Sequence, residues 1–288
     1  MDFKVKSGSG LSGEVQLPGD KSISHRSIMC AALAEGTSTI NGFLEGEDCL
    51  ATLDAFSKMG VSINRTDNKV AVQGVGLNGL KEPNSELNLG NSGTSMRLMS
   101  GILSGQKFPT LLTGDSSLSS RPMERIITPL KLMGSSISSN SEGNPPIKIQ
   151  PSLGLNSLSY ELPIASAQIK SCLMFAGLYA NGPVTVIEHL ETRNHTELMF
   201  QQFGIAVEVN ETGKDARVTL KFCPEHYNVY MNEVIPAMPM KYKILTKIAL
   251  KIGAIKVVVL KHMQSDLCFY CRFGSGGHGK KSELPPMP

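Results

Sequence analysis

Tryptophan is absent from this chain of 288 residues, and aromatic residues make up only 6% of it. The sequence contains no run of 18 apolar residues, so we expect no membrane-spanning helix. The opening residues Met1-Asp2-Phe3-Lys4 lead into no apolar signal segment, and we therefore expect a cytoplasmic protein. Only six cysteines occur, and so few in a chain of this length indicate buried thiols rather than a disulfide framework.

Charge is distributed unevenly along the chain. Residues 1–222 carry 19 Lys and Arg against 21 Asp and Glu, a net charge of −2. Residues 223–288 carry 9 Lys and Arg against 4 Asp and Glu, a net charge of +5. The length exceeds that of one average domain. The two parts are therefore interpreted separately.

Three segments of the first part, residues 21–26, 91–97 and 165–170, share one pattern. Small and hydroxyl residues stand where an apolar helix is expected to begin, and a cation follows a small residue by four positions. The pairs are Ser22 and Arg26, Gly93 and Arg97, and Ser166 and Lys170. A helix N-terminus attracts anions through its unpaired N–H groups and its positive dipole end. We therefore predict a pocket for a ligand with several negative charges.

The pattern belongs to a longer repeat. Gly60, Gly134 and Gly204 each follow a predicted helix, 74 and 70 residues apart, and Gly is the usual residue just beyond a helix end. Alternating apolar and polar residues after these glycines predict strands at 61–64, 70–73 and 206–209. The sequence thus predicts three units between residues 20 and 222, each with a helix, strands, a second helix and a strand pair.

Four motifs carry a family resemblance. They are LPGDKSISHR (17–26), LGNSGTSMR (89–97), SSRPM (119–123) and PIASAQIKS (163–171). In this order they resemble the signatures of the 5-enolpyruvylshikimate-3-phosphate synthase (EPSP synthase) family, and the resemblance extends to about Leu220. It implies an α/β (α+β) fold, a prism of repeated βαβαββ units that forms one of the family's two domains.

The resemblance also implies a reaction. The family transfers the enolpyruvyl group of phosphoenolpyruvate to the 5-hydroxyl of shikimate 3-phosphate and releases phosphate, on the route to chorismate, without a metal or organic cofactor. We expect these two small molecules as ligands, and neither nucleic acid nor membrane. The expected organisation is strands of the missing second domain at 1–18, the three-repeat binding domain at 19–222 and an unrelated tail, disordered or frame-shifted, at 223–288.

The motifs imply a surface that binds phosphoenolpyruvate, called here the phosphoenolpyruvate floor. By resemblance it consists of Asn91, Gly93, Thr94 and Arg97, with Arg121 pairing with the charges of that ligand. The planar guanidinium group suits these places because it matches carboxylate and phosphate. Gly93 leaves the floor without a side chain, which in this family goes with sensitivity to glyphosate.

A second set of residues is implied for shikimate 3-phosphate. Lys21 would touch both substrates, while Ser22 and Arg26 would hold the ring substituents and the carboxylate. Ser166, Gln168 and the backbone N–H of Ala167 would bind the 3-phosphate and pack on the ring. Arg193 resembles the phosphate-binding arginine of one branch of the family. We interpret His25 and His195 as structural.

The family pattern stops after Lys221. In the family the second domain supplies an aspartate and a glutamate for proton transfer, which have no counterpart here, so we predict no catalytic residue and impaired turnover by this chain alone. Lys243, Lys247 and Lys251 at helical spacing predict a basic amphipathic helix in the tail.

Two other functions stay open at this point. One is the sister reaction on UDP-N-acetylglucosamine, although the first motif of that enzyme has Asn where Ser22 stands. The other is a non-catalytic, anion-binding half-scaffold. An open face toward a missing domain would also favour self-association or a complementing C-terminal half.

Overall fold

The structure is a computed structural model that describes residues 18–66, 69–212 and 215–220, together with the backbone of the further strands named below. The chain forms two compact units, residues 18–238 and residues 1–17 with 239–288. Every described helix lies in unit 18–238. Among the described residues, no helix is both long and apolar enough to span a bilayer.

Three repeats follow one another through unit 18–238. The first contains α1 (Lys21–Leu33), β2 (Glu35–Asn41), α2 (Glu47–Lys58), β3 (Ser62–Thr66) and β4 (Lys69–Val75). The second contains β5 (Leu87–Asn88), α3 (Gly93–Leu103), β6 (Thr110–Thr113), α4 (Ser116–Ser119), α5 (Glu124–Leu132), β7 (Ile137–Ser138) and β8 (Ile147–Ile149). The third contains β9 (Leu158–Glu161), α6 (Ala167–Gly177), β10 (Val184–Glu188), α7 (His195–Gln202), β11 (Val207–Thr212) and β12 (Asp215–Leu220). The predicted order of helices and strand pairs is confirmed.

Each repeat belongs to one four-stranded sheet, and the three sheets have the same topology. The second and third sheets have the orders β5-β6-β8-β7 and β9-β10-β12-β11, in which the first pair is parallel and the other pairs are antiparallel. The first sheet has the order β13-β2-β4-β3, and β13 (Val234–Pro236) is parallel to β2. A strand from beyond residue 222 therefore takes the place that β5 and β9 take in the other sheets.

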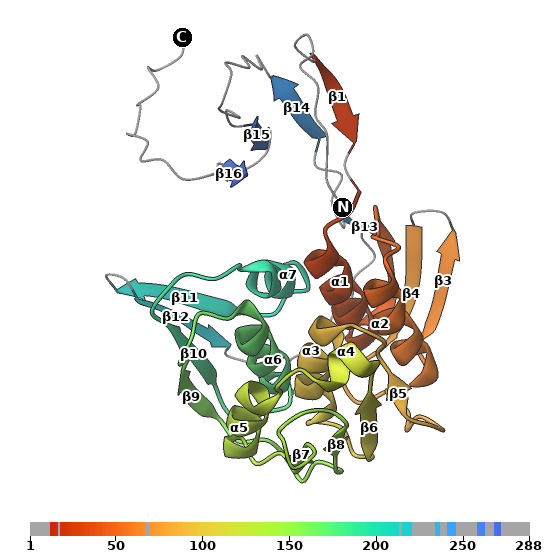
Figure 1. The fold of residues 1–288 in the computed structure, drawn as a ribbon, viewed down its shortest axis with the longest axis vertical. Helices are drawn as coiled ribbons and strands as arrows, with labels where there is room; N and C mark the ends of the chain where they lie inside the picture. The colour runs from red at the N-terminus through yellow and green to blue at the C-terminus, as the bar shows by residue number, and fades with distance from the viewer. Residues whose placement is uncertain are drawn as a thin grey trace. The chain divides into compact units, whose positions relative to one another are not determined.

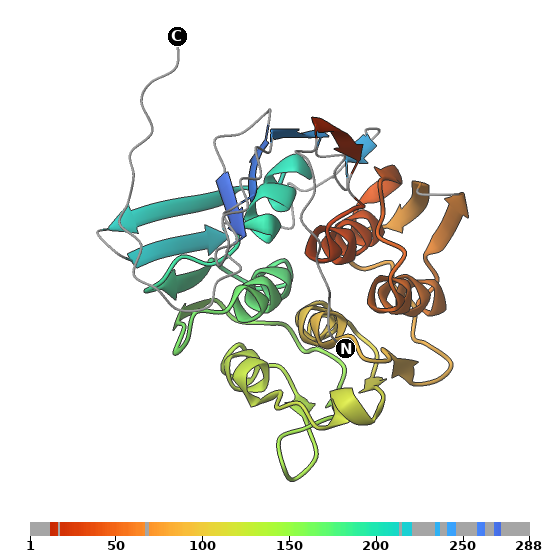
Figure 2. The ribbon, with the colours of Figure 1, turned by 45° about the horizontal axis from the view of Figure 1, so that its top comes forward.

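The sheets lie on the outside of unit 18–238, and α1, α3 and α6 lie next to one another at its centre (Figures 1 and 2). In α1, every residue from Ser24 to Leu33 is buried, so protein surrounds that part of the helix. The α3 and α6 backbones approach closely at Gly101, where an added Cβ would lie 2.1 Å from the carbonyl oxygen of Cys172. The three helices with predicted anion-binding N-termini thus form the core.

The second helix of each repeat ends in the same capping motif. The glycines predicted at these ends, Gly60, Gly134 and Gly204, have φ values of 89°, 91° and 76°. In each, the glycine N–H and the next N–H bond back to carbonyls of the last turn, as in Val61 N to Phe56 O at 3.1 Å. The predicted helix ends are confirmed, because glycine adopts positive φ without strain.

The described strands of the other unit form one antiparallel sheet. Its order is β1 (Ser12–Gln16), β14 (Lys241–Leu245), β15 (Val258–His262) and β16 (Cys268–Cys271). The helix predicted from Lys243 onward is wrong at its start, because residues 241–245 are a strand. Lys-Tyr-Lys-Ile also alternates with a period of two, and pairing with β1 selects the strand. Residues 1–11 of the segment expected to contain strands and most of 223–288 lie outside the described residues, and the division at 18 and 222 stays a prediction.

Candidate functional site

The N-termini of α1, α3 and α6 are capped by side chains. Asp20, Ser92 and Ser166 accept hydrogen bonds from backbone N–H groups three residues further on, at 2.8, 3.2 and 3.3 Å. Counted from these caps, the three predicted cations occupy the sixth, fifth and fourth helical positions, namely Arg26, Arg97 and Lys170. Successive helical residues point about 100° apart. The three cations therefore occupy different positions on their helices, although each follows a small residue by four positions.

Lys170 does not face a ligand site. Its side chain is 1% exposed, and its Nζ lies 2.7 Å from Glu188 Oε2 and 2.5 Å from Glu197 Oε1. A buried lysine charge needs such counter-charges. The expectation that this cation would serve an anion at the start of α6 is corrected by these two ion pairs.

Arg97 joins α3 to α6. Its Nη1 donates to Gln168 Oε1 at 3.1 Å, and Gln168 Nε2 donates to Thr94 Oγ1 at 3.0 Å. The pKa of Arg97 is lowered, first by burial and then by the positive charges of Arg121 and Arg125. Three of the predicted residues therefore form one hydrogen-bonded group, in which the cation is surrounded by further positive charge.

A second arginine converges on the same place. Arg121 donates from Nη2 to Asn91 Oδ1 and from Nη1 to the Asn91 carbonyl oxygen at 3.4 Å. A Cβ added to Gly93 would lie 2.8 Å from Arg97 Nη1 and 3.1 Å from Arg121 Nη1. Two guanidinium groups thus meet over a residue without a side chain. A bound carboxylate or phosphate would offset the repulsion between them.

Arg26 is held inside the protein by three hydrogen bonds that it donates. Nε donates to Thr196 Oγ1 and Nη2 to Ser171 Oγ, both at 2.7 Å, and Nη1 donates to the Ser22 carbonyl oxygen at 2.9 Å. Burial lowers the pKa of this guanidinium to about 10. Arg193 Nη1 donates to Ser22 Oγ at 3.2 Å. The structure therefore gathers Ser22, Arg26 and Arg193 around the start of α1.

The remaining predicted residues lie at helix starts. Lys21, half exposed, forms an ion pair with Asp48 of α2. Ser166 caps α6, and the N–H groups of Ala167 and Gln168 belong to the first turn, where a helix has no acceptors for them.

Several supporting side chains were not assigned a role from the sequence. They are Asp48, Ser171, Glu188, Thr196 and Glu197. Ser171 lies inside the motif at 163–171, so motif membership was a usable signal for that residue, and Thr196 follows the singled-out Arg193 by three positions. For Asp48 and Glu188 no such signal existed, because their partners are 27 and 18 residues away in the sequence.

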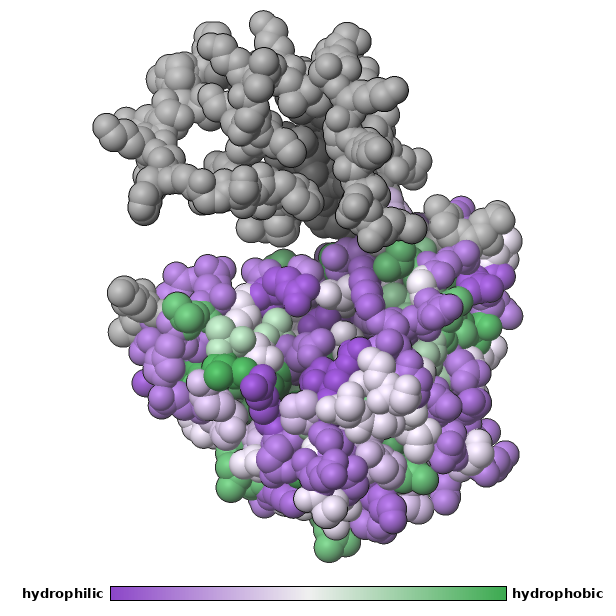
Figure 3. All heavy atoms as spheres, viewed as in Figure 1, coloured by the Kyte–Doolittle hydropathy of each residue, from purple (hydrophilic) through white to green (hydrophobic). Residues whose placement is uncertain are grey.

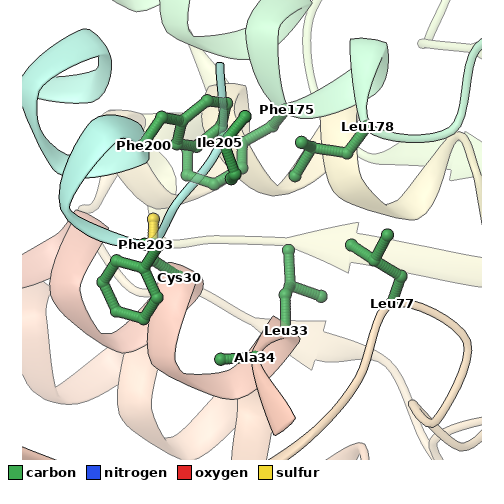
Figure 4. Close-up of a pocket in the computed structure, with 9 residues that line it drawn as sticks. All are labelled: Cys30, Leu33, Ala34, Leu77, Phe175, Leu178, Phe200, Phe203 and Ile205. Atoms are coloured by element: carbon green, nitrogen blue, oxygen red, sulfur yellow. The ribbon is translucent and has the colours of Figure 1, made fainter. Parts of the chain in front are cut away.

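A separate pocket lies at the C-terminal ends of α1 and α6 (Figure 4). Its walls are Cys30, Leu33, Ala34, Leu77, Phe175, Leu178, Phe200, Phe203 and Ile205. The one polar side chain among them is the Cys30 thiol, whose pKa is raised by burial. Such walls offer nothing to a phosphate. By contrast, the face of unit 18–238 seen in Figure 3 is mostly hydrophilic.

Comparisons with known proteins agree with the four motifs. A profile of the family described as EPSP synthase (3-phosphoshikimate 1-carboxyvinyltransferase) matches residues 5–226. The 3-phosphoshikimate 1-carboxyvinyltransferases of Hydrogenovibrio crunogenus and Ruthia magnifica are 52% and 55% identical, over 76% and 73% of this chain and 50% and 48% of their own lengths. A solved EPSP synthase structure from Acinetobacter baumannii is 51% identical, with a TM-score of 0.69 over 74% of this chain and 48% of its own. The chain spans about half the length of the curated relatives that it matches.

Proposed function

This chain belongs to the EPSP synthase family, and we propose that it is the half that binds shikimate 3-phosphate and phosphoenolpyruvate for enolpyruvyl transfer to the 5-hydroxyl group with release of phosphate. The observation that carries the proposal is the convergence of Arg97 and Arg121 over Gly93. These groups would receive the charges of phosphoenolpyruvate on a floor that includes Asn91 and Thr94. Planar guanidinium groups form bidentate hydrogen bonds with carboxylate and phosphate.

Shikimate 3-phosphate would occupy the neighbouring helix starts. The hydroxyl of Ser22 and the guanidinium of Arg193 lie together and would hold one end of this ligand. Ser166, the N–H of Ala167 and the amide of Gln168 would hold the phosphate at the start of α6. Gln168 also contacts Arg97, so it would connect the two substrate positions.

Two other residues would act at the edges of this site. Arg26 uses three N–H groups within the protein, and a guanidinium has five, which leaves two for a carboxylate of the ligand. Lys21 forms an ion pair with Asp48 in this structure. Its ammonium group would turn partly away from Asp48 to contact both substrates. The paired substrates carry two phosphates and two carboxylates, so a cluster of cations offsets their mutual repulsion.

Turnover would need a second half. The reaction requires general acid–base groups at the vinyl carbon and at the hydroxyl, and we assign none to residues 18–238. A complementing C-terminal half, or self-association across the open face, would complete the site. The sister reaction on UDP-N-acetylglucosamine is not favoured, because the matched relatives are named 3-phosphoshikimate 1-carboxyvinyltransferase.

A calorimetric titration of the purified full chain with shikimate 3-phosphate tests the proposal. We expect saturable binding, weakened about tenfold or more in Gln168→Ala and in Arg193→Ala, because each loses hydrogen bonds to a charged ligand. Lys58→Ala, at an exposed ion pair on α2, is the control and should bind as the wild type does. Failure of a folded wild-type chain to bind would overturn the proposal.

A second experiment separates a half-enzyme from a non-catalytic scaffold. The full chain is mixed with a separately produced C-terminal half of a relative, and phosphate release from both substrates is followed. Turnover only in the mixture is expected. Binding without turnover in any mixture would favour the anion-binding scaffold.

A further inference from the structure

An ion-pair triad is buried between α6, β10 and α7. Lys170 lies between Glu188 and Glu197, and the three side chains are 1%, 2% and 4% exposed. We propose that this triad positions Arg26 and Arg193 for the anionic ligand, an inference that rests on the function proposed above. The three residues are positioning residues, since they act through their neighbours.

One end of the triad determines where Arg26 lies. Lys170 is followed by Ser171, and Glu197 is preceded by Thr196. The hydroxyls of Ser171 and Thr196 lie 2.7 Å apart, and each accepts one hydrogen bond from Arg26 at 2.7 Å. The Lys170–Glu197 ion pair joins α6 to α7 at the residues next to these hydroxyls. It therefore fixes the two side-chain acceptors that hold Arg26.

The other end of the triad determines where Arg193 lies. Glu188 Oε2 pairs with Lys170, and its Oε1 accepts a hydrogen bond from Thr192 Oγ1. Thr192 directly precedes Arg193 in the connection from β10 to α7, and Arg193 Nη1 reaches Ser22 Oγ at 3.2 Å. Glu188 thus anchors the segment that carries the second arginine.

Stable packing at this place does not require three charged side chains, so their charges indicate a further role. Apolar residues of similar size in place of a buried ion pair leave many proteins equally or more stable. Glu197 Oε2 is buried and has no hydrogen-bond partner among the described residues. Burial is the main cause of the lowered pKa of Arg26, the charge of Arg193 lowers it further, and the charge of Glu197 raises it. Glu197 therefore contributes, together with Asp20, negative charge that offsets the repulsion between two arginines at one ligand position.

The test replaces the charges and keeps the volume. The full chain carrying Lys170→Met, Glu188→Met and Glu197→Met together should unfold at a temperature close to that of the wild type, because the cost of burying three charges is removed together with their ion pairs. Its affinity for shikimate 3-phosphate should fall about tenfold or more, since both arginines lose their supports. A triad that served only the fold would leave this affinity unchanged.

A second readout does not depend on the ligand. In the 15N-labelled chain, the Arg26 Nε–H signal, assigned by its loss in Arg26→Lys, should exchange with solvent about tenfold faster in the triple variant, because its acceptor Thr196 is no longer fixed. If the wild type fails to bind shikimate 3-phosphate, the proposed function fails, and this exchange rate still tests the positioning of Arg26.

Two further variants complete the design. Lys58→Met with Asp54→Asn removes an exposed ion pair and should change neither readout. If the triple variant does not fold, Glu197→Gln, which keeps the Lys170–Glu188 pair, takes its place, and both readouts should shift in the same direction. A folded variant with wild-type affinity and wild-type Arg26 exchange would overturn the proposal.

Discussion

At Gly93, the lack of a side chain leaves room for two guanidinium groups. Arg97 approaches from the same helix, and Arg121 approaches from the segment after α4. The backbone at Gly93 is already helical, so a small side chain would fit the helix itself. A small side chain introduced here would therefore displace the two arginines and leave the helix intact. A substitution at this position can thus change ligand binding without changing stability.

Gly93→Ala is expected to keep the stability of the wild type. The added Cβ would lie 2.8 Å from Arg97 Nη1, so the guanidinium must move, and affinity for phosphoenolpyruvate in the presence of saturating shikimate 3-phosphate should fall about tenfold. Calorimetry and thermal unfolding measure the two effects. Gly46→Ala is the control, since its Cβ would meet only Leu44 at 3.9 Å. Unchanged affinity would show that the arginines do not bind this ligand.

A buried histidine gives the protein a pH dependence. His25 Nδ1 lies 2.7 Å from Thr52 Oγ1, and burial lowers the pKa of this ring from 6.5 to about 4. Between these values the unfolded chain binds a proton that the folded chain does not. The free energy of unfolding should therefore decrease by about 3 kcal/mol from this group as the pH falls from 6.5 to 4. Urea unfolding in His25→Gln should show a correspondingly shallower pH dependence.

His189 is a control, because the pKa of its ring is shifted in the opposite direction to that of His25. Hydrogen bonds to Asp215 and Glu161 raise the pKa of this exposed ring. Its contribution is fully present below 6.5 and is lost as the pH rises through the raised value. His189→Gln should therefore leave the loss of stability between pH 6.5 and 4 in place. A His25→Gln variant with the wild-type slope would contradict the assignment to His25.

At the scale of the element, each second helix ends by the same chemistry. The glycine after α2, α5 or α7 has a positive φ, and two backbone bonds close the last turn. The chain then enters the strand pair of its repeat. The capping motif therefore sets where each strand pair begins, and it recurs because the requirement is local.

Gly204→Ala tests the requirement for a positive φ at the residue after the helix. Nothing lies within 4 Å of the added Cβ, while φ is +76°, so the cost is that of the backbone conformation alone. We expect a loss of about 1 kcal/mol in urea unfolding. Gly204→Asn is the matched variant and should lose less, because Asn tolerates the left-handed region. Equal losses in the two variants would point to a cause other than φ.

At the scale of the whole molecule, the first sheet is completed from a distant part of the chain. β13 pairs with β2 through Val234, Ile235 and Pro236. Without it, the backbone groups along β2 would form an open sheet edge, which favours pairing between molecules. The first repeat therefore depends on residues beyond 222, although the family resemblance ends near that position.

Two shortened chains test this dependence. A chain ending at residue 222 should lose stability and self-associate relative to a chain ending at residue 238, because only the latter keeps β13. The expected difference is about 1–2 kcal/mol, as for the loss of a few hydrogen bonds. Both chains lack β14, so the comparison isolates β13. Sedimentation and urea unfolding give the answer, and identical behaviour would rule out a supporting role for β13.

The parts of the fold that were predictable from the sequence are those set by residues close together along the chain. The helix starts after Asp20, Ser92 and Ser166 and the glycine ends follow from capping and from φ. The side-chain partners were less predictable. Arg26, Arg97 and Lys170 look alike in the sequence, yet one binds hydroxyls of two other helices, one meets Arg121, and one is buried between carboxylates.

By itself the sequence determined the family, the three repeats and the set of arginines and helix starts, because these depend on residues close together along the chain. The tertiary structure decided that Lys170 is buried between two glutamates, that β13 fills the first sheet and that residues 241–245 form a strand. These outcomes depend on partners that are distant in the sequence. The burial of a charge and the pairing of a strand are settled only when those partners meet.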